Sequence, residues 1–242
     1  MLFRSSNPTY LVSSGERRWV LRKKPPGKLL PSAHQVDREF RVMQALKDTD
    51  AAVARLVEGL KARGLWGSAN LVILADHGMA PTSAQRVVYL DDIAPAGSFR
   101  TLTGGPLSGS FPVAGREAEA YRLLGRHPHM PCWKKCQIPV RYHFGPHRRI
   151  PPIVCLAETG WLIRTHAEAK ERPTKDGGAH GFDPYDPLMR ALFIAHGPAF
   201  RSGVVVGGFD NVDVYPMLAR LVGIVPLKND GDRRTMTRLL RR

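Results

Sequence analysis

Apolar residues recur at two different periods along the chain of 242 residues, and this pattern predicts alternating helices and strands. Between residues 50 and 63, four apolar positions at i, i+3, i+4 and i+7 share one face of a helix, and Gly64 ends it. The continuous apolar run 71–75 predicts a central strand that is covered on both faces. A helix, a short loop and a buried strand are typical of an α/β protein.

After this strand, segments with a regular apolar pattern are separated by a long segment without one. Residues 94–150 are rich in Gly, Pro and His and contain no long periodic segment, which predicts a loop-rich region. Apolar runs at 153–156 and 191–195 predict two further strands. Residues 213–222 predict a helix that Gly223 closes. The α/β character therefore continues toward the end of the chain.

The first 49 residues have a different pattern. Short apolar runs at 10–12 and 18–21, separated by turn-forming residues, predict a hairpin. Pro and Gly between residues 23 and 28 predict a loop. Ser32 is a candidate cap for a helix that runs to about Leu46. The two helices on either side of residues 47–49 are predicted to be separate.

Basic residues outnumber acidic ones, with 36 Lys and Arg against 21 Asp and Glu, a formal charge of +15. This excess favours anionic partners and non-specific adhesion to nucleic acid or membrane surfaces, or simply a basic solvated surface. Neither zinc-finger spacing nor an aromatic-interleaved RNA-binding motif accompanies the charge. No window approaches 18 uncharged apolar residues, so no transmembrane helix is expected. The first residues lack a readable secretory signal, which favours a cytoplasmic location.

The three cysteines, Cys132, Cys136 and Cys155, are too few for a disulfide scaffold. Their C-x3-C spacing, with no second pair, argues against a zinc knuckle. Two alternatives stay open. The cysteines are three thiols, or Cys132 and Cys155 form one disulfide in an exported protein.

The strongest chemical signal follows the strand 71–75 directly. Ligands bind beyond the carboxyl ends of strands in open α/β sheets, and Asp76 and His77 lie at such an end. A carboxylate and an imidazole are both zinc ligands, and Gly78 beside them allows a sharp turn. His180, between glycines, is a candidate third ligand. The alternative is a solvated surface turn for the pair and a solvated loop histidine for His180.

Other polar residues are weaker candidates. His127 and His129, with His143 and His147, either line the mouth of a substrate site or belong to surface loops. Asp183 and Asp210 are predicted to be structural rather than catalytic.

Four segments, in order and at fitting spacing, resemble the type I phosphodiesterases/nucleotide pyrophosphatases of the alkaline-phosphatase superfamily. They are residues 70–79, 179–184, 195–200 and 209–216, so that the resemblance covers about residues 50–232. It implies an α/β/α sandwich, two zinc ions, a threonine nucleophile and a nucleotide or phosphodiester substrate. By the same resemblance, Asp76 and His77 match ligands of the zinc that activates the nucleophile, and His180 matches a ligand of the other zinc. Members of the family are often exported.

The sequence also departs from the family pattern. No threonine stands in the setting of the family nucleophile, and only three of the six expected metal ligands are matched. The expected fold is therefore an incomplete alkaline-phosphatase-like α/β/α sandwich, and hydrolysis is expected to be impaired. The alternatives are a non-catalytic metal- or anion-binding remnant and an unstable fused gene fragment.

Residues 4–49 resemble the N-lobe of aminoglycoside-phosphotransferase-like kinases, which implies a small α+β fragment. In this resemblance Arg22 or Lys23 lies near the nucleotide phosphates, and Glu39 is the partner on the helix. No kinase catalytic loop occurs in the chain, so phosphate transfer is not expected. We therefore predict two parts, a kinase-lobe-like fragment at 1–49 and a phosphodiesterase portion at 50–242, with a fusion point near residues 47–50.

Overall fold

The computed structural model describes residues 9–14, 17–22, 36–95 and 97–241. These residues divide into two compact units. One unit takes in the described parts of Met1–Val72 and Ala195–Arg242, and the other is Ile73–Ile194. None of the helices in the described ranges is long and apolar enough to cross a membrane.

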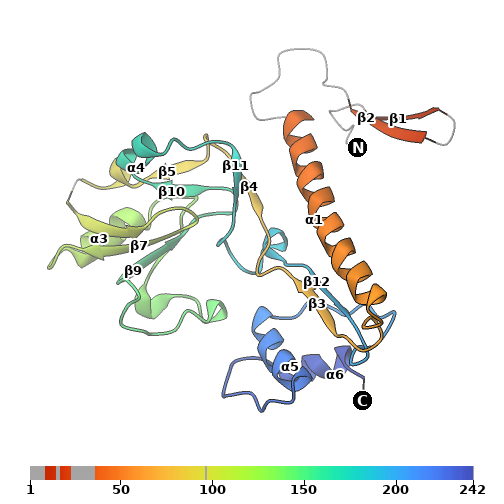
Figure 1. Ribbon diagram of the computed structural model, residues 1–242. Helices are drawn as coiled ribbons and strands as arrows, with labels where there is room; N and C mark the ends of the chain where they lie inside the picture. Colours follow the sequence, from red (N-terminus) through yellow and green to blue (C-terminus); the bar gives the residue numbers. More distant parts are fainter. Residues whose placement is uncertain (1–8, 15–16, 23–35, 96, 242) are drawn as a thin grey trace, which may run out of the picture. The chain divides into compact units, whose positions relative to one another are not determined.

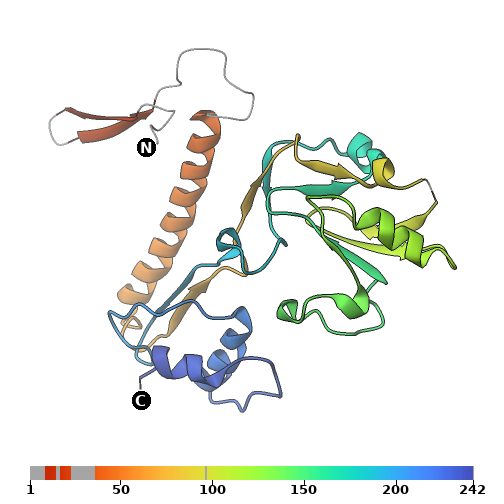
Figure 2. The same cartoon turned by 180° about the vertical axis from the view of Figure 1, so that it is seen from behind.

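The first unit begins with the predicted hairpin, in which β1 (Thr9–Ser14) pairs antiparallel with β2 (Arg17–Arg22). The predicted loop at 23–28 and the Ser32 cap lie outside the described residues. A single helix of 27 residues, α1 (Val36–Ala62), then replaces the two predicted helices. The helix is unbroken in Figures 1 and 2. Residues 47–49 contain neither Gly nor Pro, so nothing in the local sequence interrupts the backbone hydrogen bonds.

The strand predicted at 71–75 is β3 (Leu71–Leu74), and it pairs with β12 (Phe193–His196) in a two-stranded sheet. The prediction that both its faces are covered is wrong for the described residues. Three of the four side chains are only half-buried, and Leu74 is 42% exposed. An apolar run marks a strand, but its burial depends on the layers around it, and here β12 is its only partner among the described strands.

The end of the chain forms the helix predicted at 213–222 and a second helix, which the pattern did not predict. A short 3-10 turn (Asn211–Asp213) leads into α5 (Val214–Leu221), where Pro216 lies in the first turn and therefore breaks no helix bond. Gly223 has a φ of +72°, a left-handed conformation that ends the helix at little cost. The last helix is α6 (Arg233–Leu239), and Asp213 accepts hydrogen bonds from the backbone of Asp232 and from the side chain of Thr235 at its start.

The second unit contains a four-stranded antiparallel sheet. Three of its strands lie in the region 94–150 that was predicted to be loop-rich, and the fourth is the strand predicted at 153–156. The strand order of the sheet is β6-β7-β9-β8. The sequence pattern did not predict β7. Ser108 and Ser110 occupy fully buried positions in this strand, so it lacks the alternation of apolar and polar residues that marks a strand. The strands are β6 (Phe99–Thr103), β7 (Leu107–Pro112), β8 (Cys132–Lys134) and β9 (Ile153–Leu156).

The core of this unit lies between the sheet, one helix and the loops that follow. All four residues of β9 are buried, and Leu124, Met130 and Ile163 are fully enclosed. Two small sheets complete the unit, one parallel (β5 with β10) and one antiparallel (β4 with β11). The remaining elements are β4 (Ala80–Thr82), β5 (Val87–Tyr89), α2 (Leu90–Ile93), α3 (Glu117–Leu124), β10 (Leu162–Arg164), α4 (His166–Glu171) and β11 (Gly177–Ala179).

The described strands form five separate sheets, and the largest is antiparallel. The fold is α/β, as predicted, but the described residues do not assemble the continuous central sheet of an α/β/α sandwich.

The cysteines follow the second of the two alternatives. Cys132 and Cys155 are directly opposed on β8 and β9 and form a disulfide, while Cys136 is an exposed free thiol. The reading of three thiols is therefore wrong.

Candidate functional site

The turn after β3 carries the first two predicted ligands. His77 Nε2 lies 3.4 Å from Asp76 Oδ2, and the carboxylate of Asp76 is largely exposed. His77 Nδ1 donates a hydrogen bond to the carbonyl oxygen of Gly78, at 2.8 Å. Since a carbonyl can only accept, Nδ1 carries a hydrogen in this contact, and in the neutral imidazole Nε2 is then the nitrogen that can bind a cation.

The third predicted ligand lies against this turn although it is distant in the sequence. The imidazole rings of His77 and His180 are stacked, with centroids 3.6 Å apart and planes 11° from parallel. The pairing of two short strands brings the two segments together. Ala80 at the start of β4 pairs with Ala179 at the end of β11, so the chain that precedes Ala80 and the chain that follows Ala179 leave the pair on the same side.

Gly78 allows a second segment to pass close to the turn. Its backbone N–H donates to the carbonyl of Met189, at 2.9 Å. A Cβ on Gly78 would lie 2.1 Å from the carbonyl oxygen of Leu188, closer than any ordinary contact. Ala75 N–H also donates to the carbonyl of Leu192, at 3.0 Å. The sequence identified Gly78 as a turn residue but gave no sign of this close approach.

The donor types at this point fit zinc, which accepts both imidazole nitrogen and carboxylate oxygen. A zinc site needs at least three protein ligands around one ion. Among the described residues, no group of three or more His, Cys, Asp and Glu side chains is arranged to hold a metal ion. Asp76, His77 and His180 have side chains of the right chemistry for zinc, and their role as metal ligands stays a prediction.

Asp183 lies three residues after His180 and is held by a cation. Arg141 donates hydrogen bonds to both of its carboxylate oxygens, and these bonds are the main reason that the pKa of Asp183 lies below its ordinary value. The prediction that Asp183 has a structural rather than a catalytic role stays a prediction. Sequence reasoning missed Arg141, because its partner is 42 residues away and no local pattern connects the two.

His127 and His129 belong to a different cluster of the second unit. His129 pairs with Glu158 at 2.5 Å and stacks on Trp161, with ring centroids 3.8 Å apart. Burial, with a smaller effect from the charge of His129, lowers the pKa of the His127 imidazole. Nothing in the contacts of the described residues joins either ring to His77 or His180, so their place at a substrate mouth stays a prediction.

Comparison with known proteins places the chain in a family. The family model of type I phosphodiesterase / nucleotide pyrophosphatase matches residues 31–183. Bis(5'-adenosyl)-triphosphatase enpp4 of Xenopus laevis is 34% identical over 186 residues, which cover 77% of this chain and 40% of that protein. The Mus musculus protein of the same name is 35% identical over 203 residues, covering 83% and 43%.

Solved structures agree with the sequence matches. Human ectonucleotide pyrophosphatase/phosphodiesterase 5 superposes with a TM-score of 0.76 at 31% identity, over 81% of this chain and 52% of that chain. An inactive variant of the murine protein, solved in complex with AMP, gives a TM-score of 0.74 at 32% identity, over 80% and 51%. The chain thus spans about half the length of the relatives that it matches.

These matches also bear on the first part of the chain. Residues 31–49 lie inside the matched family range, and the comparisons give no support to the resemblance of residues 4–49 to a kinase N-lobe. The boundary at residue 49 stays a prediction. With a family model that matches well over half of its residues, the chain belongs to the type I phosphodiesterase/nucleotide pyrophosphatase family of hydrolases.

Proposed function

We propose that the turn of Asp76 and His77, together with His180, holds zinc and acts on a phosphodiester or nucleotide diphosphate bond. The observation that carries this proposal is the stacking of His77 on His180, which brings residues from two distant segments to one point. The nitrogen lone pairs of two parallel, stacked imidazole rings lie in two separate planes. His77 and His180 are therefore better placed to bind two neighbouring cations than to share one. This agrees with the resemblance, in which the two histidines serve different zinc ions.

The substrate class rests on the relatives. Two of them are described as bis(5'-adenosyl)-triphosphatases, and a third was solved with AMP. We extend this to the present chain as a nucleotide or nucleotide-like phosphodiester. The excess of basic residues, +15 in all, favours such anionic substrates and also adhesion to nucleic acid.

The chain's own residues would bind and orient. His77 presents Nε2 because the carbonyl of Gly78 holds the proton on Nδ1, and Asp76 supplies a carboxylate on the same turn. Zinc, when bound, would neutralise phosphoryl oxygens and lower the pKa of a nucleophile. Because no threonine stands in the family's nucleophile setting, we propose that turnover is weak.

The test is hydrolysis of a chromogenic phosphodiester by the purified chain with added zinc. We expect low, EDTA-sensitive turnover that is lost in His77→Ala and in His180→Ala. The control is Arg122→Ala, which removes an exposed side chain of the same unit and should leave turnover unchanged. Turnover that survives in both site variants would refute the proposed site.

A second candidate function is binding of metal or anions without turnover, and the incomplete ligand set favours it. Folded protein that binds zinc and AMP but shows no hydrolysis would support this candidate over the enzyme. Salt-sensitive AMP binding that His77→Ala abolishes would locate the binding at the same turn.

We also propose that the protein works in an oxidising compartment rather than in the cytoplasm. The support is the disulfide between Cys132 and Cys155, since such bonds persist in oxidising compartments and are rare in the cytoplasm. Thiol labelling of protein trapped directly from the native host would test this, and two further reactive thiols besides Cys136 would contradict it.

A further inference from the structure

Arg141 joins two segments of the second unit, one of which carries His180. It lies in a 3-10 turn (Val140–Tyr142), and its guanidinium contacts both carboxylate oxygens of Asp183, with distances of 3.0 Å to Oδ1 and 2.5 Å to Oδ2. Two parallel charge-assisted bonds fix the orientation of both groups, which a single surface ion pair does not. The side chain of Asp183 is about 30% exposed, so solvent screens the pair only in part.

Two tyrosines reinforce this junction. The hydroxyl of Tyr142 donates to Asp183 Oδ2 at 3.2 Å, and the hydroxyl of Tyr185 donates to the backbone carbonyl of Arg141 at 3.0 Å. The guanidinium carbon lies 4.1 Å from the ring centre of Tyr142 and 5.3 Å from that of Tyr185. Cations favour the faces of such rings. The segments are thus connected by ionic, aromatic and backbone contacts together.

The segment that receives these contacts also carries His180. On one side of His180, β11 fixes the chain through its pairing with β4. On the other side, Gly181 has a φ of +95° and Phe182 is buried in the core. Asp183 follows directly and accepts the backbone N–H of Tyr185 at 3.0 Å, which shapes the next turn. Arg141 therefore acts on the part of the segment that β11 does not hold.

We propose that Arg141 is a positioning residue, which fixes the segment after His180 through Asp183 and so keeps the His180 imidazole against His77. Its effect on a metal ligand rests on the proposed function, whereas its effect on the segment does not. Arg141 and Asp183 are 42 residues apart in the sequence, so their ion pair forms only in the tertiary structure.

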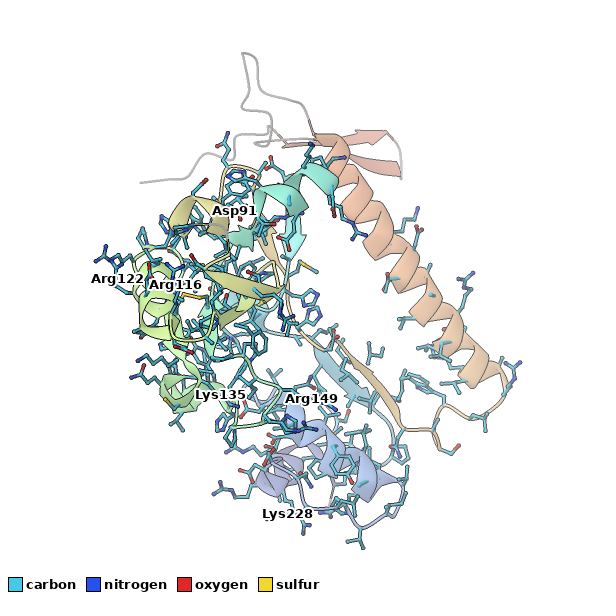
Figure 3. All side chains as sticks on the ribbon, turned by 90° about the vertical axis from the view of Figure 1, so that its left-hand side faces the viewer. Asp91, Arg116, Arg122, Lys135, Arg149 and Lys228 are labelled. Atoms are coloured by element: carbon cyan, nitrogen blue, oxygen red, sulfur yellow. A yellow bond between two sulfur atoms is a disulfide. The ribbon has the colours of Figure 1, made fainter. Side chains whose placement is uncertain are left out.

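The test compares Arg141→Ala with Arg122→Ala. Arg122 is exposed and extends outward from α3 in the same unit, so its removal takes away the same charge without touching the segment. Figure 3 shows its orientation. The first measurement is hydrogen exchange at the amides of Tyr185 and Asp186 in the zinc-free protein. We expect exchange at least tenfold faster in Arg141→Ala and unchanged in Arg122→Ala.

The second measurement is zinc affinity, by competition with a chelator. Loss of a group that orients a metal ligand typically weakens binding by about 10- to 100-fold. We expect zinc affinity to fall about tenfold in Arg141→Ala at an unchanged urea midpoint. The loss should be smaller in Arg141→Lys, which keeps the positive charge but cannot make the two parallel hydrogen bonds of a guanidinium. Because Arg141→Ala could unfold the unit, Asp183→Asn, which is nearly isosteric, provides a second variant with the same expected direction.

The outcomes separate the two proposals. If the wild-type chain binds no zinc, the proposed site fails, while exchange alone still decides the role of Arg141. If exchange and zinc affinity in Arg141→Ala both match those of Arg122→Ala, the positioning role is refuted. A loss of affinity that only follows a fall in the urea midpoint, in Arg141→Ala and Asp183→Asn alike, also refutes it.

Discussion

Gly78→Ala should destabilise the second unit, because the backbone of residues 188–190 passes where the new methyl group would lie. A Cβ at this position would be 2.1 Å from the oxygen of Leu188, and 2.8 Å from both the oxygen of Arg190 and the carbonyl carbon of Met189. Relief of the shortest contact, from 2.1 Å to the 3.4 Å at which ordinary van der Waals contact begins, needs a shift of about 1.3 Å. Such a shift also removes the hydrogen bond from Gly78 to Met189.

The magnitude follows from two contributions. Overpacking a tight contact costs about 1–3 kcal/mol, and loss of one backbone hydrogen bond costs about 1 kcal/mol. We therefore expect the free energy of unfolding to fall by about 2–4 kcal/mol. With an m-value of about 2 kcal/mol/M in urea, the midpoint should move down by about 1–2 M.

The assay is urea unfolding followed by far-ultraviolet circular dichroism, with Gly177→Ala as the matched control. Gly177 is in the same unit, and a Cβ there would meet only ordinary contacts, at 3.7 Å from Lys175 and 3.8 Å from Thr82. A midpoint for Gly78→Ala within about 0.3 M of that of Gly177→Ala, about 0.6 kcal/mol, would refute the close approach of residues 188–190.

Two further predictions concern the same unit. The disulfide between Cys132 and Cys155 closes a loop of 23 residues, so the double alanine variant should unfold with about 3 kcal/mol less free energy than the wild type. Cys136→Ala, an exposed position, should change the urea midpoint little, and equal midpoints for both variants would contradict the prediction. Burial, and then the charge of His129, place the pKa of His127 below its ordinary value, so the unfolded chain binds the proton more tightly than the folded one. The stability that neutral His127 gives is fully present above about pH 6.5 and falls as the pH drops below it, and His127→Gln should flatten this part of the curve of urea midpoint against pH. Identical curves for the two proteins between pH 8 and 5.5 would exclude the effect.

Local chemistry in the sequence was enough to predict several elements and the candidate ligands. Apolar periodicity predicted the helix around 50–63, the strand at 71–75 and the helix near 213–222, because each depends on contacts between near neighbours. The position of Asp76 and His77 after a strand, and the glycines around His180, identified the three candidate ligands, and the family motifs pointed to the same residues.

Tertiary structure alone decided which of these residues meet and what holds them. The strand β7 was missed because buried serines interrupt its apolar pattern, and the burial of β3 was overestimated because a run of apolar residues does not specify its neighbours. The stacking of His77 on His180 depends on the register of β4 with β11. Two further contacts join segments that are distant in the sequence. Arg141 pairs with Asp183, and the backbone of residues 188–190 lies against Gly78. Such contacts depend on loop closure and on the packing of the whole unit, and neither can be predicted from the local sequence.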